Sequence, residues 1–387
     1  MKSYKLGEIA SFFQGKQVDL ENQFLNKDEN HNVRFVRIVD YTNSDEPIRY
    51  IENLGEKYYA REGDLVMIRY GSQTAGKVVM GKSGIIANNM FKINLDNTVA
   101  NNEFMYYYLS QPHIFDYLRR AQSSSTMPAI NFGMLNNFEV MIPNIDIQEK
   151  IVSILKKLDD RIKINTQIND NLSEQLQLIY DEWFGKYETD SLPDGWKVEK
   201  LKNIATLSQG VQVPIDKQIY EEKSGYTRFI RIVDITQEND KDIRYIEDTE
   251  RGKVEENEIF MIRYGTPGIL SWNYKGIIAN NLFKITPKMN CISSNFLYSY
   301  FNNNKFQRYI RGNATSSTMP AIKFSTLNDR DIIIPTTDLI EKFNNISETI
   351  RLKQLSISNQ NKTLSNLKDI LLPKLMNGEI DLDKIEI

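Results

Sequence analysis

The run Met67-Ile68-Arg69-Tyr70-Gly71 returns unchanged as Met261-Ile262-Arg263-Tyr264-Gly265, and this repetition decides the architecture of the chain. Four other segments recur with it in the same order, namely residues 5–10, 34–40, 84–89 and 124–130. Each recurrence lies 192 to 195 positions after its first copy. Solenoid repeats have periods of about 20 to 50 residues. The longer period found here therefore indicates a duplicated domain.

Each copy changes character near its end. Its first part consists of short apolar runs broken by Gly and Asn, such as residues 64–68, which are typical of β-strands. After Ile142-Pro143 and Ile334-Pro335, apolar residues recur at helical spacing. The sequence thus predicts an α+β protein in which two similar β-rich domains are separated by two long antiparallel helices, paired as a coiled-coil rod and related by a pseudo-twofold axis. The predicted segments are a first β-rich domain (1–144), a central long helix (145–186), a second β-rich domain (187–336) and a C-terminal long helix with its tail (337–387).

Heptad spacing predicts that the two helices pair with each other. The chosen residues alternate at intervals of three and four, which keeps them on one stripe of a helix. Both stripes have the same phase relative to the repeat, and this favours a mutual pair over two unrelated amphipathic surface helices. The predicted contact residues are Ile151, Ile154, Leu158, Asn165, Ile168, Leu172 and Ile179 in the first helix, and Phe343, Ile346, Ile350, Ile357, Leu364, Leu367 and Leu371 in the second.

Composition places the chain among globular proteins. Of its 387 residues, 41% are hydrophobic, which is enough for packed cores in two or three domains. One cysteine and two histidines exclude a disulfide framework and a Cys/His zinc site. No apolar run reaches the roughly 18 to 20 residues of a membrane span, and residues 1–8 lack a signal-peptide core. We therefore expect a cytoplasmic protein without a metal site of its own.

Charge is unevenly distributed along the chain. The net charge is -3, but none of the 51 acidic residues lies between residues 259 and 328, where an even distribution would place about nine. Residues 65–93 and 117–138 are also free of acids. A chain segregated in this way can present a basic face although it is acidic overall. The alternative is a neutral, loop-rich region that arose by chance.

The acid-poor segments carry side chains suited to nucleic acid. Arg and Lys can contact phosphates, while Arg, Asn, Gln and Lys can read base edges. The asparagine pairs are equally compatible with turns, the two tyrosines with the core, and Arg37 and Arg231 with a structural role. The candidate DNA-binding residues are Arg69, Tyr70, Ser72, Gln73, Lys77, Lys82, Asn88, Asn89, Arg119, Arg120, Ser124, Ser125 and Thr126 in the first copy, and Arg263, Tyr264, Thr266, Lys275, Asn280, Asn281, Arg308, Arg311, Ser316, Ser317, Thr318 and Lys323 in the second.

Catalytic motifs are poorly supported. Residues 76–83 match the phosphate-binding pattern G-x-x-x-x-G-K-[ST], but that loop must open a helix, and the following residues 84–89 are typical of a strand. The second copy lacks the pattern. The Asn/Asp-Pro-Pro-aromatic motif of amino-methyltransferases and the G-x-S-x-G nucleophile elbow are both absent. We expect a chain with no catalytic residues and no bound cofactor.

The chain resembles the specificity subunit of Type I restriction-modification systems over essentially its whole length. The resemblance lies in the run 63–72 with Gly76-Lys77, in the helix entry Ile142-Pro143 followed by residues 148–151, and in the opening of the second copy from Trp196 to Gly210. Its most specific part is the ending Leu-Leu-Pro-Lys-Leu-Met-Asn-Gly-Glu-Ile at 371–380. In the second helix no Gln precedes Glu341, unlike Gln148 before Glu149, which puts equal docking of partners at both ends in doubt.

The resemblance implies a non-catalytic subunit of a DNA adenine methyltransferase and restriction endonuclease used in host defence. Its β-rich domains would be target-recognition domains that each read half of a bipartite DNA site. Two methyltransferase (M) subunits and the restriction (R) subunits would assemble on it, and S-adenosylmethionine, ATP and Mg²⁺ would belong to those partners. From the repeat itself we expect half-sites in inverted orientation and a nearly palindromic site. The competing interpretations are a free-standing DNA-acting enzyme and a coiled-coil scaffold whose domains bind protein.

Overall fold

The computed structural model divides into two compact units. It describes residues 1–43, 46–71, 74–120, 129–237, 242–314 and 320–382. Unit 1 comprises residues 1–163 and 362–387, and unit 2 comprises residues 164–361. Helices α6 (Ile145–Tyr180) and α12 (Thr337–Met376) each contribute to both units. The segments predicted from the sequence treat the helices as separate from the β-rich domains, whereas here each unit includes part of both.

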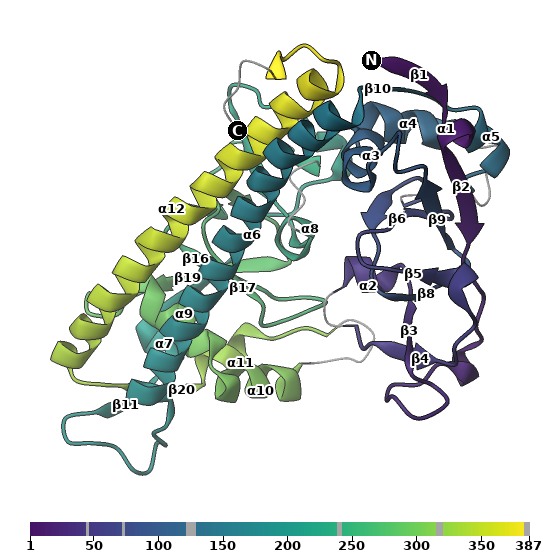
Figure 1. Cartoon of the computed structure of the whole chain (residues 1–387). Helices are drawn as coiled ribbons and strands as arrows, with labels where there is room; N and C mark the ends of the chain where they lie inside the picture. Colours follow the sequence, from purple (N-terminus) through teal and green to yellow (C-terminus); the bar gives the residue numbers. More distant parts are fainter. Residues whose placement is uncertain (44–45, 72–73, 121–128, 238–241, 315–319, 383–387) are drawn as a thin grey trace. The chain divides into compact units, whose positions relative to one another are not determined.

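Unit 1 is built on two four-stranded sheets and a two-stranded one (Figure 1). The strand orders are β2-β9-β6-β7, β4-β3-β8-β5 and β1-β10. All pairs are antiparallel except β3 with β8. The strands are β1 (Lys2–Lys5), β2 (Ala10–Gln14), β3 (Val33–Val36), β4 (Arg49–Ile51), β5 (Tyr59–Ala60), β6 (Leu65–Ile68), β7 (Val78–Met80), β8 (Gly84–Ile86), β9 (Met90–Leu95) and β10 (Glu139–Ile142). The shorter helices are α1 (Leu6–Ile9), α2 (Val39–Thr42), α3 (Asn102–Leu109), α4 (Pro112–Arg120) and α5 (Phe132–Asn136).

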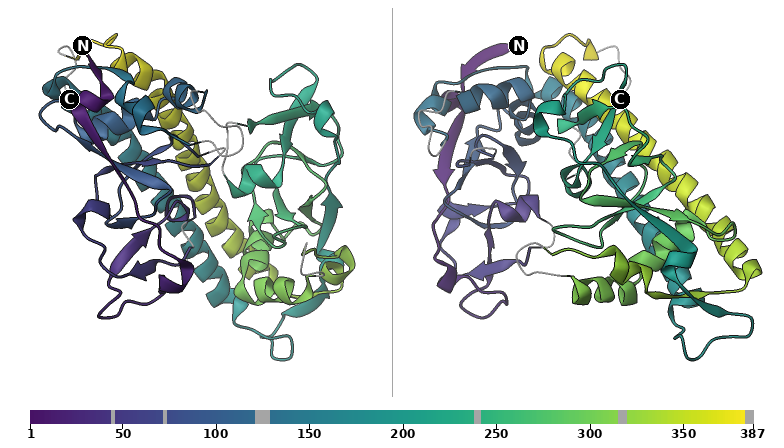
Figure 2. Two further views of the ribbon diagram at one scale, coloured as in Figure 1. Left: turned by 90° about the vertical axis from the view of Figure 1, so that its right-hand side faces the viewer. Right: turned by 180° about the vertical axis from the view of Figure 1, so that it is seen from behind.

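Unit 2, whose strands Figure 2 draws in teal and green, has the same strand order in its sheets as unit 1. Its sheets have the orders β12-β19-β16-β17, β14-β13-β18-β15 and β11-β20, and β13 with β18 is again the parallel pair. The strands are β11 (Lys197–Lys200), β12 (Ala205–Gln209), β13 (Tyr226–Ile230), β14 (Arg244–Glu247), β15 (Lys253–Val254), β16 (Ile259–Ile262), β17 (Leu270–Ser271), β18 (Gly276–Ile278), β19 (Leu282–Pro287) and β20 (Asp331–Ile334). The shorter helices are α7 (Leu201–Ile204), α8 (Ile232–Thr236), α9 (Ser294–Asn302), α10 (Asn304–Asn313) and α11 (Phe324–Asn328). The duplicated domain inferred from the sequence is confirmed.

The long helices complete the main hydrophobic core of each unit. In unit 1, Leu155 of α6 and Leu375 of α12 pack in the same cluster as Phe91 and Phe104. In unit 2, Tyr180 of α6 and Phe343 of α12 lie with ring centroids 5.8 Å apart inside the core. Neither unit has a closed core without both helices, so apolar burial holds the helices to the sheets.

The two units dock their helices through different polar residues. In unit 1 the fully buried Gln148 accepts a hydrogen bond from the backbone N–H of Asn101 at 2.8 Å and donates to the oxygen of Val99 at 2.8 Å. In unit 2 Asn344 makes the corresponding contacts. It accepts a hydrogen bond from the Ser293 hydroxyl at 2.6 Å and donates one to the backbone oxygen of Cys291 at 2.9 Å. The missing Gln of the second copy is therefore replaced by an amide about one turn further along the helix.

The two long helices pair antiparallel through polar contacts. In unit 1, Lys368 Nζ donates to Asp159 Oδ1 at 2.5 Å. In unit 2, Asn165 donates to Asn361 Oδ1 at 2.9 Å, and Gln354 donates to the Ser173 hydroxyl at 2.7 Å. Positions on α12 fall as their partners on α6 rise, which defines an antiparallel register. Polar pairs of this kind specify register, although they add less stability than apolar contacts.

Two of the fourteen residues predicted for the seam between the helices lie outside it. Each helix has one column of predicted contact residues that is buried or half-buried. The column consists of Ile151, Leu158, Asn165, Leu172 and Ile179 in α6, and of Phe343, Ile350, Ile357, Leu364 and Leu371 in α12. Ile168 and Leu367 were assigned wrongly, since they are 38% and 41% exposed. Their places are taken by the next residues, Asn169 and Lys368, which face the partner helix. Ile154 and Ile346 are half-buried beside the buried Leu155 and Ser347. Asn169 and Lys368 are polar, so a pattern based on hydrophobicity selects their apolar neighbours Ile168 and Leu367 instead.

A pair of substitutions on α12 tests this register. Leu375→Ala should lower the free energy of unfolding of unit 1 by about 2 to 5 kcal/mol, because it removes a fully packed side chain. Leu367→Ala should change it by less than about 0.5 kcal/mol, because that side chain is already exposed. Urea unfolding followed by circular dichroism measures both. Equal losses in the two variants would contradict the assigned register.

Candidate nucleic-acid interface

In unit 1 a hairpin, a helix end and a returning segment meet around Arg69. Residues 69–77 connect β6 to β7, and Gly76 N–H donates to the oxygen of Ile68 at 2.8 Å to close the hairpin. Ile130 N–H donates to the oxygen of Arg69 at 3.0 Å, and Tyr70 forms a β-bridge with Ala129. Ala129 and Ile130 form the returning segment, which lies within the acid-free run 117–138 and is thereby attached to the hairpin.

The guanidinium of Arg69 donates hydrogen bonds within unit 1. Its Nη1 donates to Gln14 Oε1 and its Nε to the oxygen of Ile130 at 3.4 Å. The guanidinium lies 5.1 Å from the ring centroids of both Tyr70 and Phe132. These contacts fix the hairpin against the returning segment. Arg69 is therefore a positioning residue for the surface around it.

Unit 2 repeats this arrangement around Arg263. Its Nη1 donates to Gln209 Oε1 at 3.1 Å and its Nε to the oxygen of Ile322 at 3.1 Å. The rings of Tyr264 and Phe324 lie 4.9 and 4.3 Å from the guanidinium carbon. The same local chemistry thus supports the same loop in both units.

Gln14 and Gln209 were missed by the sequence reasoning as parts of this site. The Nε2 of each glutamine also donates to a backbone oxygen in the turn between two strands. Gln14 donates to Asn88 at 2.9 Å, and Gln209 donates to Asn280 at 2.7 Å. Glycine follows each glutamine because a Cβ on Gly15 would lie only 2.3 Å from two backbone oxygens. The recurrence of the Gln-Gly pair in both copies was the available signal.

The asparagine pairs form turns. Asn88 and Asn89 join β8 to β9, and the oxygen of Asn89 accepts from Arg69 N–H at 2.8 Å. The oxygen of Asn281 accepts from Arg263 N–H at 2.9 Å in the same way. The side chain of Asn280 contacts Gln212 at 3.3 Å. Both pairs therefore lie in turns, and their contact with DNA stays a prediction.

Exposed cations surround each hairpin. Gly76 lies against Leu118 of α4, and the exposed Arg119 and Arg120 follow at the end of that helix. Lys77, on the hairpin itself, is also exposed. We define the unit 1 basic surface as Lys77, Arg119 and Arg120.

In unit 2, α10 contacts the equivalent hairpin through Gln307, whose Nε2 donates to the oxygen of Gly268 at 2.9 Å. Exposed side chains lie on this helix, on the hairpin and at the start of α11. We define the unit 2 basic surface as Arg308, Arg311 and Lys323, with Thr266 exposed on the hairpin.

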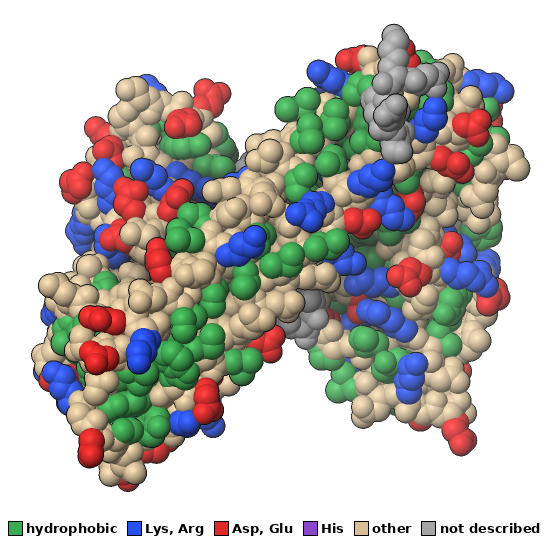
Figure 3. All heavy atoms as spheres, turned by 60° about the vertical axis from the view of Figure 1, so that its left-hand side comes forward, with side chains coloured by type: hydrophobic (Ala, Val, Ile, Leu, Met, Phe, Trp, Pro, Cys, Tyr) green, Lys and Arg blue, Asp and Glu red, His purple; other side chains and the backbone are tan. Residues whose placement is uncertain are grey.

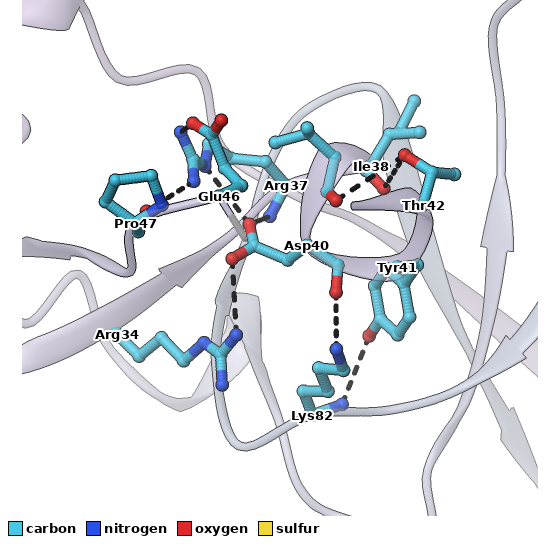
Figure 4. A network of polar contacts seen from close by, with 10 residues as sticks. Arg34, Arg37, Ile38, Asp40, Tyr41, Thr42, Glu46, Pro47 and Lys82 are labelled. Atoms are coloured by element: carbon cyan, nitrogen blue, oxygen red, sulfur yellow. Dashed lines mark hydrogen bonds and ion pairs between the residues drawn. The ribbon is translucent and has the colours of Figure 1, made fainter. Parts of the chain in front are cut away.

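Lys82 has a structural role instead of the predicted one (Figure 4). Its Nζ donates to the backbone oxygen of Asp40 and lies 4.9 Å from the ring centroid of Tyr41. The buried carboxylate of Asp40 accepts from Arg37 Nε at 3.1 Å and from Arg34 Nη2 at 3.2 Å. The network holds α2 on its sheet and leaves the Lys82 ammonium engaged within the unit.

Unit 2 builds the same network with other residues. Tyr274, at the position of Lys82, donates its hydroxyl to the oxygen of Asp234 at 3.0 Å. Arg231 Nη2 donates to Asp234 Oδ1 at 2.8 Å, and this bond raises the pKa of Arg231 above its ordinary value. The structural interpretation of Arg37 and Arg231 is thus the correct one. Lys275 forms an exposed ion pair with Glu255 at 3.1 Å, outside both basic surfaces.

Several predicted residues and motifs remain to be placed. Residues 76–83, which match the phosphate-binding pattern, run through β7 toward β8, and no helix follows them. Within the described part of the chain, no three His, Cys, Asp or Glu side chains are grouped to hold a metal ion, and no helix combines the length and apolar character needed to cross a bilayer. The predicted residues Ser72, Gln73, Ser124, Ser125, Thr126, Ser316, Ser317 and Thr318 lie outside the described residues.

Comparison with known proteins agrees with this architecture. The family model described as Type I restriction modification DNA specificity domain matches residues 1–174 and 193–363. The specificity subunit of the Type I restriction enzyme MjaIX from Methanocaldococcus jannaschii is 22% identical over 335 residues, covering 80% of this chain and 76% of that protein. The HindI specificity subunit from Haemophilus influenzae is 24% identical over 376 residues, covering 76% of this chain and 81% of that protein.

A solved structure has the same fold. The crystal structure of the Type I restriction-modification S subunit from M. genitalium superposes with a TM-score of 0.55 at 15% identity, covering 97% of this chain and 95% of that one. The family model matches the chain twice, once in each copy of the repeat, and its two matches span most of the sequence. The chain therefore belongs to the family of DNA specificity subunits of Type I restriction-modification systems.

Proposed function

We propose that each unit reads one half of a bipartite DNA site through the surface around its hairpin. The observation that carries this proposal is that both units build the same hairpin, helix end and returning segment on an internal Arg–Gln contact. Both then expose cations around it, in sequence segments with few or no acids. Exposed Arg and Lys would contact phosphates and set affinity, while small polar groups on the hairpins would meet base edges.

The likeness of the two units also predicts what kind of DNA sequence the chain recognises. Dimeric readers meet two half-sites in inverted orientation because their symmetry matches that of the duplex. The hairpins share the run Arg-Tyr-Gly, so the half-sites should share some bases and form a nearly palindromic, interrupted sequence. The basic surfaces differ in detail, because Ile269 stands in unit 2 where unit 1 has Lys77, and the half-sites should differ accordingly.

The chemistry would belong to partner subunits. We assign no catalytic residue to this chain, and the one match to a nucleotide-binding pattern spans β7 and its flanking turns. S-adenosylmethionine, ATP and Mg²⁺ would be bound by methyltransferase and restriction subunits, the former modifying adenine. A free-standing enzyme is less well supported, since it would need a phosphate-binding helix start that residues 76–83 do not have.

The long helices offer surface for those partners. Large apolar side chains remain exposed on them, with Ile164 at 47%, Ile168 at 38% and Ile370 at 57%. Figure 3 shows hydrophobic side chains gathered along part of the helices. Ile164 and Ile168 lie one turn apart on the same face of α6, and neighbouring exposed apolar side chains can mark an interaction surface. We propose that methyltransferase subunits dock there, which gives the scaffold role to the helices and the DNA-reading role to the hairpins.

Salt dependence tests the DNA contacts. In the full chain, replacing Arg119 and Arg120 together by Ala should reduce the slope of log Kd against log salt by about 1 to 2, because each lost phosphate contact removes roughly 0.9 from the slope. Fluorescence anisotropy with a labelled duplex measures this. Lys82→Met is the control, since that ammonium already contacts Asp40 and its removal should leave the slope unchanged. A wild-type slope in the double variant would contradict the assigned surface.

The recognised sequence can be mapped in cells. Methylated adenines recorded with and without this gene should define a bipartite motif whose halves share bases when one is read in inverted orientation. The physical reason is that the two hairpins carry the same Arg-Tyr-Gly run on the same scaffold. Halves with no base in common would refute the near-palindromic site but leave a bipartite reader intact.

Partner docking can be tested on the helices. Changing Ile164 and Ile168 together to Glu should abolish co-purification with the methyltransferase subunit, because charged groups would replace an apolar contact. Ile215→Glu is the matched control, since Ile215 is 78% exposed in unit 2 but lies outside the long helices. DNA affinity of the isolated chain should remain as in the wild type. Unimpaired co-purification of the helix variant would show that partners bind elsewhere.

A further inference from the structure

The hairpin that follows β16 in unit 2 exposes one large apolar side chain. Ile269 is 42% exposed, whereas Gly268 before it is buried and Leu270 after it packs against the hydrophobic core of the unit. Successive residues of an extended chain point to opposite faces, so Ile269 projects away from the core. Residues 263–270 are all described, and no other large hydrophobic side chain among them is exposed. The hairpin therefore presents a single aliphatic group to its surroundings.

Unit 1 has a cation at the corresponding position. The N–H of Ile262 donates to the backbone oxygen of Ile269 at 2.9 Å, and in unit 1 the N–H of Ile68 donates to that of Lys77 at the same distance. Ile269 and Lys77 are both exposed, so core packing does not decide which residue stands here. The two hairpins share a backbone arrangement and differ in the chemistry that they present outward.

Ile269 borders a hollow whose walls supply hydrogen-bond donors. The hollow, of about 440 Å³, lies between the hairpin, α10 and the end of α6. The exposed side chains of Asn304 and Arg311 line it from α10. Asp181, the acid in its wall, accepts a hydrogen bond from Asn303 Nδ2 at 2.7 Å. An aliphatic group thus lies beside an amide and a guanidinium on one surface of unit 2.

This combination fits one base edge of DNA. In the major groove, thymine presents the O4 acceptor beside its C5-methyl group, whereas cytosine presents an amino donor and no methyl group. An apolar side chain can contact the methyl group while an amide or a guanidinium donates to O4. A phosphate would need only the cation, and the core of a protein interface would bury more than one large apolar side chain. Contact with a thymine accounts for the aliphatic group and the donors together.

We propose that Ile269 recognises a thymine in the half-site bound by unit 2, through contact with the C5-methyl group, and that Asn304 or Arg311 donates to O4 of the same base. The inference rests on the proposed function, in which the hairpin faces DNA, and it assigns one base to one side chain. Because Lys77 ends in an ammonium group, unit 1 would not make this contact. The thymine therefore belongs to one half-site and distinguishes it from the other.

Removal of a single methyl group tests the contact. With the full chain and a labelled duplex carrying the sequence found by adenine mapping, the thymines of both strands are replaced one at a time by deoxyuridine, which lacks only the C5-methyl group. At one position in the half-site of unit 2, affinity should fall about four-fold, the equivalent of about 0.8 kcal/mol for one buried carbon. Ile269→Ala should bind the thymine and deoxyuridine duplexes equally at that position. Ile215→Ala, which alters an exposed side chain of the same unit outside the hairpin, should keep the four-fold difference.

Binding that no deoxyuridine substitution weakens would overturn the inference, and so would a loss of the same size in Ile269→Ala as in the wild type. In both cases the wild type would still prefer its own site to a scrambled duplex, and the proposed function would stand. Equal affinity of the wild type for the site and for a scrambled duplex would instead refute the proposed function, and this contact with it.

A readout in cells does not depend on measured affinities. Ile269 is exposed, so Ile269→Lys, which introduces the residue of unit 1, should leave the fold intact. Adenine mapping with this variant should show a recognised sequence that no longer requires the thymine and whose other half is unchanged. A sequence identical to that of the wild type would contradict the contact.

Discussion

Pairing of α6 with α12 is the contact on which both units depend. Each helix supplies large apolar side chains to the core of each unit, such as Leu155 and Leu375 in unit 1 and Tyr180 and Phe343 in unit 2. Between these apolar ends the seam mixes polar residues such as Asn165 with apolar ones such as Ile357. Buried amides in such a seam can be satisfied only in one register, so they determine which residues of the two helices meet. Apolar burial supplies the stability and the amides supply the alignment.

The duplicated scaffold preserves interactions more faithfully than residues. The oxygen of Asp40 accepts from the Lys82 ammonium, whereas the oxygen of Asp234 accepts from the Tyr274 hydroxyl. In both cases a long side chain reaches the same carbonyl and keeps a short helix on its sheet. The backbone hydrogen-bonding requirement is constant because an unpaired buried carbonyl is costly, while any donor of suitable reach can meet it.

The hairpin surfaces separate two kinds of cation. Arg69 and Arg263 are half-buried and use their donors on a glutamine, a backbone oxygen and two aromatic rings. Arg119 and Arg308 are exposed on helices that pack beside the hairpin. The first kind gives the loop its shape and the second kind gives the surface its charge. Under the proposed function, sequence specificity and affinity would therefore change independently in each unit, because different residues would serve them.

Much of the architecture follows from the sequence alone. The repeat reveals two domains with one fold, and the helical spacing after each Ile-Pro predicts two long helices that pair. The acid-poor segments also identify which part of each unit is basic. Sequence pattern could not decide which arginines are buried, since Arg69 and Arg119 are equally charged and both lie in acid-poor segments. Nor could it place the second column of the helix seam, where Ile168 and Leu367 look like contact residues but the polar Asn169 and Lys368 make the contacts. Local pattern records what a side chain is, whereas its role depends on partners nearly two hundred residues away, and only the folded chain brings those partners within hydrogen-bonding distance.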